Sequence, residues 1–244
     1  MKRLLSLLFI LVALFGLSGC IRYDVGINYA SQTHGEIVQR IRVGQPIANR
    51  GDSQAKVWLT TLEQRAKKLG GRIRRPNQQE LVVTIPFNNG SELTQKFNQF
   101  FAALSDEDAG EESGVAVPEI ASKLSLRESN LLLVERNRLV YDVDLRSLGV
   151  LSPDGTVLVS PGALLEMEFS LNTPWGGRSL DDSLIPKIDR LGRRFTWTLK
   201  AGETNHIEAI FWIPSPLGIG TAVIVGLVAL GAGFKAQLSR QAPV

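Results

Sequence analysis

The sequence is short of the residues that most often carry out chemistry. Its 244 residues include one cysteine and two histidines. Because Cys20 is alone, an intramolecular disulfide framework is excluded and no second thiol is available for redox or metal work. His34 and His206 lie far apart and have no closely spaced ligands. The chain also has no glycine-rich phosphate loop and no G-x-S-x-G motif. We therefore predict no catalytic residue, no cofactor and no metal.

An excess of charge of one sign is lacking as well. The chain has 27 basic and 24 acidic residues, and without Lys2 and Arg3, which precede the predicted cleavage site, the balance is 25 to 24. A nearly neutral protein gives no electrostatic reason to expect nucleic acid as a partner. The acidic segment 105–117 lacks the ligand alternation of an EF-hand loop, so we expect a mobile, solvated insert there.

The N-terminus has the layout of a lipoprotein signal peptide. Met1-Lys2-Arg3 is followed by an apolar run, Leu4 to Leu17, that is too short to span a bilayer comfortably. Leu17, Ser18, Gly19 and Cys20 then resemble a bacterial lipobox, in which the cysteine is diacylated on sulfur and becomes the first mature residue. We predict a signal peptide at 1–19 and lipidation of Cys20. A plain signal peptide or an anchor helix is the alternative.

The C-terminal region contains one long hydrophobic run. Pro216 to Phe234 has no charged residue and, at ~1.5 Å per residue, is long enough to cross a bilayer as a helix. We predict a transmembrane helix at 214–235 and, because Lys235 and Arg240 follow it, a cytoplasmic tail at 236–244. The domain between the two anchors then lies on the extracytoplasmic side.

Residues around this span have predicted roles of their own. Phe211 and Trp212 precede the span and are candidates for interfacial aromatics. Gly218, Ala222 and Gly226 recur every four residues and would let another helix approach closely, although a plain lipid-facing anchor is the default expectation.

The region 20–213 predicts one α+β domain. Its first half reads ββαββα and its second half is mostly antiparallel β. The predicted elements of the first half are strands Tyr23–Tyr29 and Glu36–Val43, a helix from Asp52 or Ser53 to Leu69, strands Arg72–Arg75 and Leu81–Phe87, and a helix Ser91–Leu104. In the second half they are strands Ser122–Leu126, Asn130–Glu135, Arg138–Leu145 and Leu164–Leu171 and a last hairpin turning at Lys200–Asn205.

Three surface features are candidates for contact or chemistry. A basic set at the end of the first helix could contact anionic headgroups, at about 1 kcal/mol per charge, or could simply suit the helix dipole: Arg65, Lys67, Lys68, Arg72, Arg74 and Arg75. Trp175, between Pro174 and Gly176, could enter a membrane interface or lie buried under its loop. Asp142 and Asp144 could form a carboxylate pair, but the alternating apolar neighbours indicate an ordinary solvent-exposed strand face.

Several short motifs occur together: the lipobox at Cys20, Trp197-Thr198-Leu199, Gly202, Asn205, and Phe211 to Pro216 ahead of one span. In this combination the chain resembles a domain-of-unknown-function family of cyanobacterial and plastid membrane lipoproteins, which is distantly LppM-like. The resemblance covers most of the mature chain. It implies an α+β fold associated with lipid binding and supplies no catalytic residues.

The sequence therefore predicts a membrane-anchored, non-enzymatic domain that binds a lipid or amphiphile at the membrane surface. A structural or assembly factor for a membrane protein complex is the alternative, and an envelope hydrolase is less favoured. Membrane lipids are the expected partners, and the oligomeric state is left open. Because both ends are predicted anchors, we expect Tyr23–Tyr29 and His206–Trp212 to lie close together on the membrane-facing side.

Overall fold

The computed structural model describes residues 21–42, 53–77, 79–102, 120–148 and 165–241. It confirms an α+β fold with two sheets, three helices and a C-terminal apolar helix. The predicted signal peptide, Cys20 with its lipobox residues, and the acidic segment 105–117 lie outside the described residues.

The large sheet has seven strands in the order β3-β4-β2-β1-β7-β10-β9. Their bounds are β1 Ile21–Ser31, β2 His34–Arg42, β3 Arg72–Asn77, β4 Glu80–Phe87, β7 Leu165–Asn172, β9 Lys187–Ile188 and β10 Arg194–Thr198. β1 pairs in parallel with β7, and the other pairs are antiparallel.

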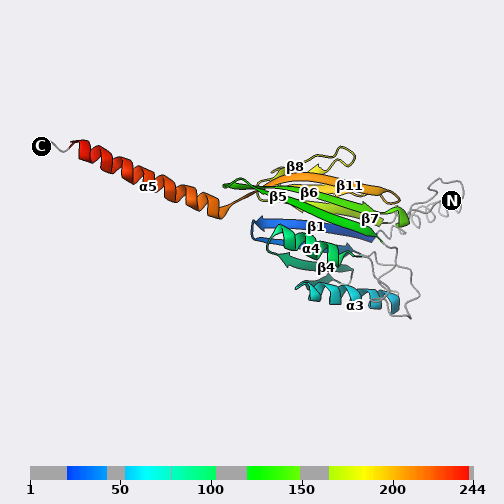
Figure 1. Cartoon of the computed structure of the whole chain (residues 1–244). Helices are drawn as coiled ribbons and strands as arrows, with labels where there is room; N and C mark the ends of the chain where they lie inside the picture. The colour runs from blue at the N-terminus through cyan, green and yellow to red at the C-terminus, as the bar shows by residue number, and fades with distance from the viewer. Residues whose placement is uncertain (1–20, 43–52, 78, 103–119, 149–164, 242–244) are drawn as a thin grey trace, which may run out of the picture.

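The small sheet has four strands in the order β5-β6-β11-β8. Their bounds are β5 Ala121–Asn130, β6 Val134–Asp144, β8 Gly177–Ser179 and β11 Thr204–Pro214, and a 3₁₀ turn at Arg146–Leu148 follows β6. The helices are α3 Ser53–Lys68, α4 Gly90–Phe100 and α5 Pro216–Gln241. Figure 1 shows the two sheets layered against each other, with α5 extending away from one end.

The core lies between the sheets and is filled by aromatic and aliphatic side chains. Tyr141 stacks on Phe169 at a centroid distance of 4.6 Å, and Phe169 in turn contacts Trp197 at 5.8 Å. α4 adds Leu93, Phe97 and Phe100 to the same cluster, as their helical spacing predicts. The predicted ββαββα half is confirmed as β1-β2-α3-β3-β4-α4.

Strand alternation gives the large sheet one face that is buried in the core and one face that points away from the small sheet, which we call the open face. Along β1, Val25, Ile27 and Tyr29 are buried in the core. The intervening residues point the other way, because successive side chains on a strand leave opposite faces. The same alternation holds on β4, where Leu81, Val83, Ile85 and Phe87 are buried.

Two predictions for the second half are wrong. The predicted strand Asn130–Glu135 and turn at Arg136-Asn137 are replaced by two longer strands that turn at Leu131–Leu133. Asn137 is fully buried within β6, where its amide donates to Glu135 at 2.9 Å. The hydrophobicity of the leucine run favours a strand, and the polar Arg136-Asn137 pair favours a turn, but Asn137 is buried and Arg136 lies on the exposed face of β6.

The predicted last hairpin is also wrong, because β10 and β11 belong to different sheets. The turn at Lys200–Asn205 carries the chain from one sheet to the other. Asn205 holds this crossing: its side chain accepts from the Lys200 amide at 2.7 Å and donates to the Lys200 carbonyl at 2.9 Å. Alternation alone cannot tell such a crossing from a hairpin, because both reverse the chain.

The expected proximity of the first and last strands holds, but not at their anchored ends. Tyr29 and Phe211 touch across the core with ring centroids 5.0 Å apart. However, β1 begins at the end of the sandwich opposite to α5 (Figure 1). Ile21 precedes Tyr29 by eight residues, or about 26 Å of strand. The first residues of β1 and of α5 therefore lie at opposite ends of the domain.

Carboxylates gather at the α5 end of the core. Glu135 is buried and accepts from Gln32 at 2.7 Å, while Glu128 accepts from the Gly90 amide at 2.9 Å. Burial, and then the charge of Glu135, raise the pKa of Glu128 above its usual range. A raised pKa means that folding disfavours the ionised form of Glu128. The resulting loss of folding free energy is absent at low pH, where the carboxyl is protonated, and grows as the pH rises from the unfolded-state pKa through the raised folded-state pKa.

We therefore expect Glu128→Gln to stabilise the protein at pH 7 by up to about 0.5 kcal/mol, with no gain at pH 4. Denaturant unfolding at the two pH values measures this, with the exposed Glu203→Gln as the control. A gain that is equal at both pH values would show that the charge of Glu128 has no part in it.

Candidate functional site

The open face of the large sheet carries polar side chains in rows across neighbouring strands. The strand registers place Arg74, Val82, Arg40, Asp24 and Glu168 in one row. The next row toward α5 is Arg72, Thr84, Val38, Gly26, Ser170 and Thr196. Apart from Arg72 at its edge, this row has only short side chains or, at Gly26, none. A band of short side chains between longer charged ones makes a groove.

The groove has a volume of about 360 Å³, and its floor depends on Gly26. A Cβ at this position would lie 2.7 Å from the Ser170 hydroxyl. Charged and polar residues form the walls: Arg22, Asp24, Asn28, Arg40, Arg42, Glu168 and Arg194. Asn28 and Arg194 lie at the end nearer α5, since both register with Asn172.

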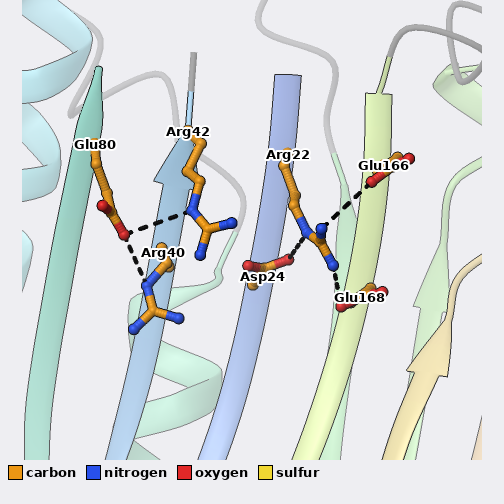
Figure 2. A network of polar contacts seen from close by, with 7 residues as sticks. All are labelled: Arg22, Asp24, Arg40, Arg42, Glu80, Glu166 and Glu168. Carbon is orange, nitrogen blue, oxygen red and sulfur yellow. Dashed lines mark hydrogen bonds and ion pairs between the residues drawn. The ribbon is translucent and has the colours of Figure 1, made fainter. Parts of the chain in front are cut away.

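One wall of the groove is a network of ion pairs (Figure 2). Arg22 lies 2.8 Å from Glu168, 3.2 Å from Asp24 and 3.7 Å from Glu166. Hydrogen bonds to Glu168 and then Asp24 raise the pKa of Arg22 further above its usual value. This side of the groove is rich in carboxylate.

The neighbouring side is rich in arginine. Arg40 and Arg42 both reach the same Glu80 oxygen, at 3.0 and 3.5 Å. Figure 2 shows the two guanidinium groups on β2 converging on this single carboxylate of β4. Two cations share one anion, so this corner has positive charge to offer a further anionic group.

The structure places the residues of the predicted headgroup set in different settings, and their contact with headgroups stays a prediction. Arg65 donates to the Phe100 and Ala102 carbonyls at 3.4 and 2.8 Å, which fastens α3 to the end of α4. Arg75 pairs with Glu63 at 2.8 Å. Lys67 and Lys68 are exposed at the end of α3, and Arg72 and Arg74 extend the open face along β3.

α5 is long and apolar enough to cross a membrane: Pro216–Lys235 has a mean hydropathy of 2.1. The helix begins against the turn between β5 and β6. The Ser215 amide donates to the Leu133 carbonyl at 2.9 Å, and a Cβ at Gly218 would lie 1.6 Å from the Leu132 carbonyl oxygen. The small size of Gly218 therefore serves a contact with this turn.

The other predicted interface residues fall into two groups. Phe211 is fully buried against Tyr29, so its predicted interfacial role is wrong: β11 continues to alternate into the core up to Ile213. Trp175 is 53% exposed, and Trp212 is partly exposed with its amide 3.4 Å from the Gly176 carbonyl. Ala222 and Gly226 lie exposed along α5, as a lipid-facing helix requires.

The residues considered for chemistry are divided between the two sheets. Asp142 pairs with His206 on the outer face of the small sheet, while Arg146 holds Asp144 and lowers its pKa to about 2. His34 lies on β2, in the other sheet. In the part of the chain that the structure describes, no group of three or more His, Cys, Asp or Glu side chains could hold a metal ion.

Residues 25–241 match the model of a family described as proteins of unknown function, DUF3153. The chain belongs to the DUF3153 family. The match begins within β1 and ends at the last residue of α5, so it includes the candidate span. No curated protein matches the chain.

A likeness to one solved structure extends over most of this DUF3153 chain. The folded domain of LppM from Mycobacterium tuberculosis, determined by NMR, is 16% identical, with a TM-score of 0.40. The similarity covers 80% of this chain and 91% of that domain.

Proposed function

We propose that this chain is a membrane-anchored, non-enzymatic domain that binds the anionic headgroup of a lipid or other amphiphile at the extracytoplasmic membrane surface. The observation that carries the proposal is the groove on the open sheet face, where Arg40 and Arg42 share Glu80. Its Asn28 and Arg194 end lies toward α5, from where a headgroup can enter.

The filled core argues for binding on the surface of the sandwich. Trp197, Phe169 and Phe195 are fully buried between the sheets. A lipid carrier that encloses acyl chains needs an apolar cavity of several hundred Å³. The groove is of that size, but its walls are charged, so it suits the headgroup of an amphiphile better than its acyl chains.

The charge pattern indicates the chemistry of the ligand. A phosphate, sulfate or carboxylate would face the Arg40 and Arg42 corner, because guanidinium groups bind such oxyanions through paired hydrogen bonds. Hydroxyl or amine groups on the same headgroup would face Asp24 and Glu168, which accept hydrogen bonds. α5 would keep the groove attached to the membrane that contains its ligand.

Replacing Arg40 and Arg42 together by glutamine should weaken binding about 30-fold, at roughly 1 kcal/mol for each charge near an anionic surface. Binding of the full chain in nanodiscs to short-chain phosphatidylglycerol, a sulfated glycolipid and inorganic phosphate can be compared by calorimetry. Lys123→Gln with Arg127→Gln removes two charges from the other sheet and should change binding little.

Gly26→Val provides a second arm, because it fills the floor of the groove without altering charge. Loss of binding in both groove variants, with the control unaffected, supports a built site. Equal weakening in the groove and control variants would show unspecific electrostatic attraction. Binding of inorganic phosphate without binding of either lipid would show that the groove takes a free anion and would contradict an amphiphile as the ligand.

A second candidate is an assembly factor for a membrane protein complex. It is favoured by the same open face, on which seven strands present a broad polar surface beside the membrane. A protein that co-purifies in stoichiometric amount, and is lost in the Arg40 and Arg42 variant, would support it over lipid binding.

A further inference from the structure

The turn between β5 and β6 exposes three consecutive leucines at the root of α5. Leu131 is 61% exposed, Leu132 68% and Leu133 42%. Contiguous exposed apolar side chains mark surfaces that meet another apolar phase. We name these three residues the leucine tip, and we propose that the leucine tip inserts into the bilayer beside α5.

Continuity with α5 sets the depth of the leucine tip. Its backbone contacts Gly218, which is the third residue of the candidate span Pro216–Lys235. Twenty residues at ~1.5 Å per residue match a hydrocarbon core of ~30 Å, so Gly218 lies within the first turn below the outer boundary. A loop that touches the helix at this height lies at the same depth.

The backbone of the leucine tip is prepared for a medium without water. An unpaired amide in hydrocarbon costs several kcal/mol, so inserted loops need internal partners. The Leu131 amide donates to the Val134 carbonyl at 2.8 Å, and the Leu133 amide donates to the Leu131 carbonyl at 2.9 Å. The Leu132 amide donates to the Asn130 side chain at 3.0 Å. All three amide groups are satisfied within the turn.

Leu132 has a left-handed backbone, with a φ of 70°. A leucine in this conformation is strained by about 1–3 kcal/mol, and glycine or asparagine would be the usual choice in a solvated turn. In water the exposed Leu132 side chain contributes no burial of apolar surface that would offset this strain. If the turn enters the bilayer, the side chain is removed from water and the strain is offset.

Other exposed residues at the same end of the sandwich agree with this orientation. Trp175 follows β7 near Gly192, since a Cβ at Gly176 would lie 2.4 Å from the Gly192 carbonyl oxygen. Leu191, in the turn before β10, is exposed and flanked by Arg190 and Arg193. An apolar side chain between cations suits the boundary between acyl chains and anionic headgroups.

The test is photo-crosslinking of the full chain in vesicles of phosphatidylcholine and phosphatidylglycerol that contain a phosphatidylcholine with a diazirine on its acyl chain. Mass spectrometry then locates the label. We expect the peptide with the leucine tip to carry most of the label found outside α5. Ile185 is the internal comparison: it is 83% exposed but follows β8, which leads away from the α5 end.

Two variants separate insertion from a folding defect. Leu132→Asn suits the left-handed backbone and should lower the label on this peptide at least several-fold, while label on α5 is kept. Ile185→Asn should change neither. Equal labelling of the tip and Ile185 peptides, or a tip label unchanged in Leu132→Asn, would overturn the proposal. The proposed function is independent, because neither outcome alters headgroup binding to the groove.

Discussion

Replacing both Val225 and Leu227 by aspartate should release the chain from the membrane when Cys20 is also changed to serine. Both residues lie near the middle of α5 and face outward. An aspartate at the centre of a spanning helix costs roughly 2.5–3.5 kcal/mol, whereas each Leu, Ile, Val or Phe contributes only about 0.3–0.6 kcal/mol to insertion. Two aspartates therefore reverse the balance for the whole helix.

The measurement is the fraction of the chain that sediments with membranes after carbonate washing. With Cys20 intact, the double-aspartate variant should stay bound through its predicted lipid, so the two changes are needed together. Val225→Ala with Leu227→Ala is the matched control and should stay in the membrane. Retention of a triple variant that mass spectrometry shows to lack residues 1–19 would mean that α5 is not what holds the domain.

Trp197→Ala should destabilise the domain by about 3–5 kcal/mol, because its ring is fully buried between the two sheets. The ring stacks on Phe195 at a centroid distance of 5.8 Å and contacts Phe169, so its loss leaves a cavity that neighbouring strands cannot close. A loss of this size is a large part of the 5–15 kcal/mol that typically holds a domain folded.

Trp175→Ala removes the same side chain from the surface and provides the control. We expect it to change the free energy of unfolding by less than about 0.5 kcal/mol. Denaturant unfolding of the full chain in detergent compares the two variants. Similar losses for both would mean that the space between the sheets is not the centre of stability.

The order of elements in the first half could be predicted because local patterns there agree with the fold. The helix that became α3 ends before Gly70 and Gly71, and Gly70 takes a positive φ of 72° that suits the residue after a helix. Asn89 caps α4 by accepting from the Glu92 amide at 2.8 Å. Such signals lie within a few residues of each other and need no knowledge of distant contacts.

The second half was harder because its pairing is set by long-range contacts. Asn137 is buried because β6 pairs with both β5 and β11, which places Phe211 directly opposite it. Leu131–Leu133 is exposed because the same pairing leaves it as the turn. Neither the burial of Asn137 nor the exposure of the leucines can be predicted from a window of neighbouring residues. The hydrophobicity of the leucines favours a buried strand, whereas the proposed insertion of the leucine tip assigns it to the bilayer.

The groove also escaped prediction, although its charged residues are visible in the sequence. Arg40, Glu80 and Glu168 belong to strands that are distant in the chain, and only the strand order makes them neighbours. Gly26 was the available signal: a glycine amid the alternating residues of a strand often marks close approach of another group. The basic set at the end of α3 was easier to see, but contacts within the domain engage Arg65 and Arg75.

The positions of the two chain ends bear on the predicted lipid. With the leucine tip in the bilayer, the sandwich stands upright and Ile21 lies about 26 Å from the level of Tyr29. An acyl chain on Cys20 would then reach the same leaflet only if the sandwich tilted onto its side. The orientation of the domain is therefore the central claim, on which the roles of the leucine tip and of the predicted lipid depend.

Spin labels at positions 132 and 203 measure this orientation most directly. Each is introduced as a spin-labelled amino acid into the full chain with Cys20 unchanged, and its depth is read from relaxation by oxygen and by a nickel-chelating lipid. Glu203 directly precedes β11, at the end of the strand about 36 Å from Pro214. If the sandwich stands upright on the leucine tip, label 132 lies among the acyl chains and label 203 lies beyond the reach of the nickel headgroups. Both labels at headgroup depth would contradict it.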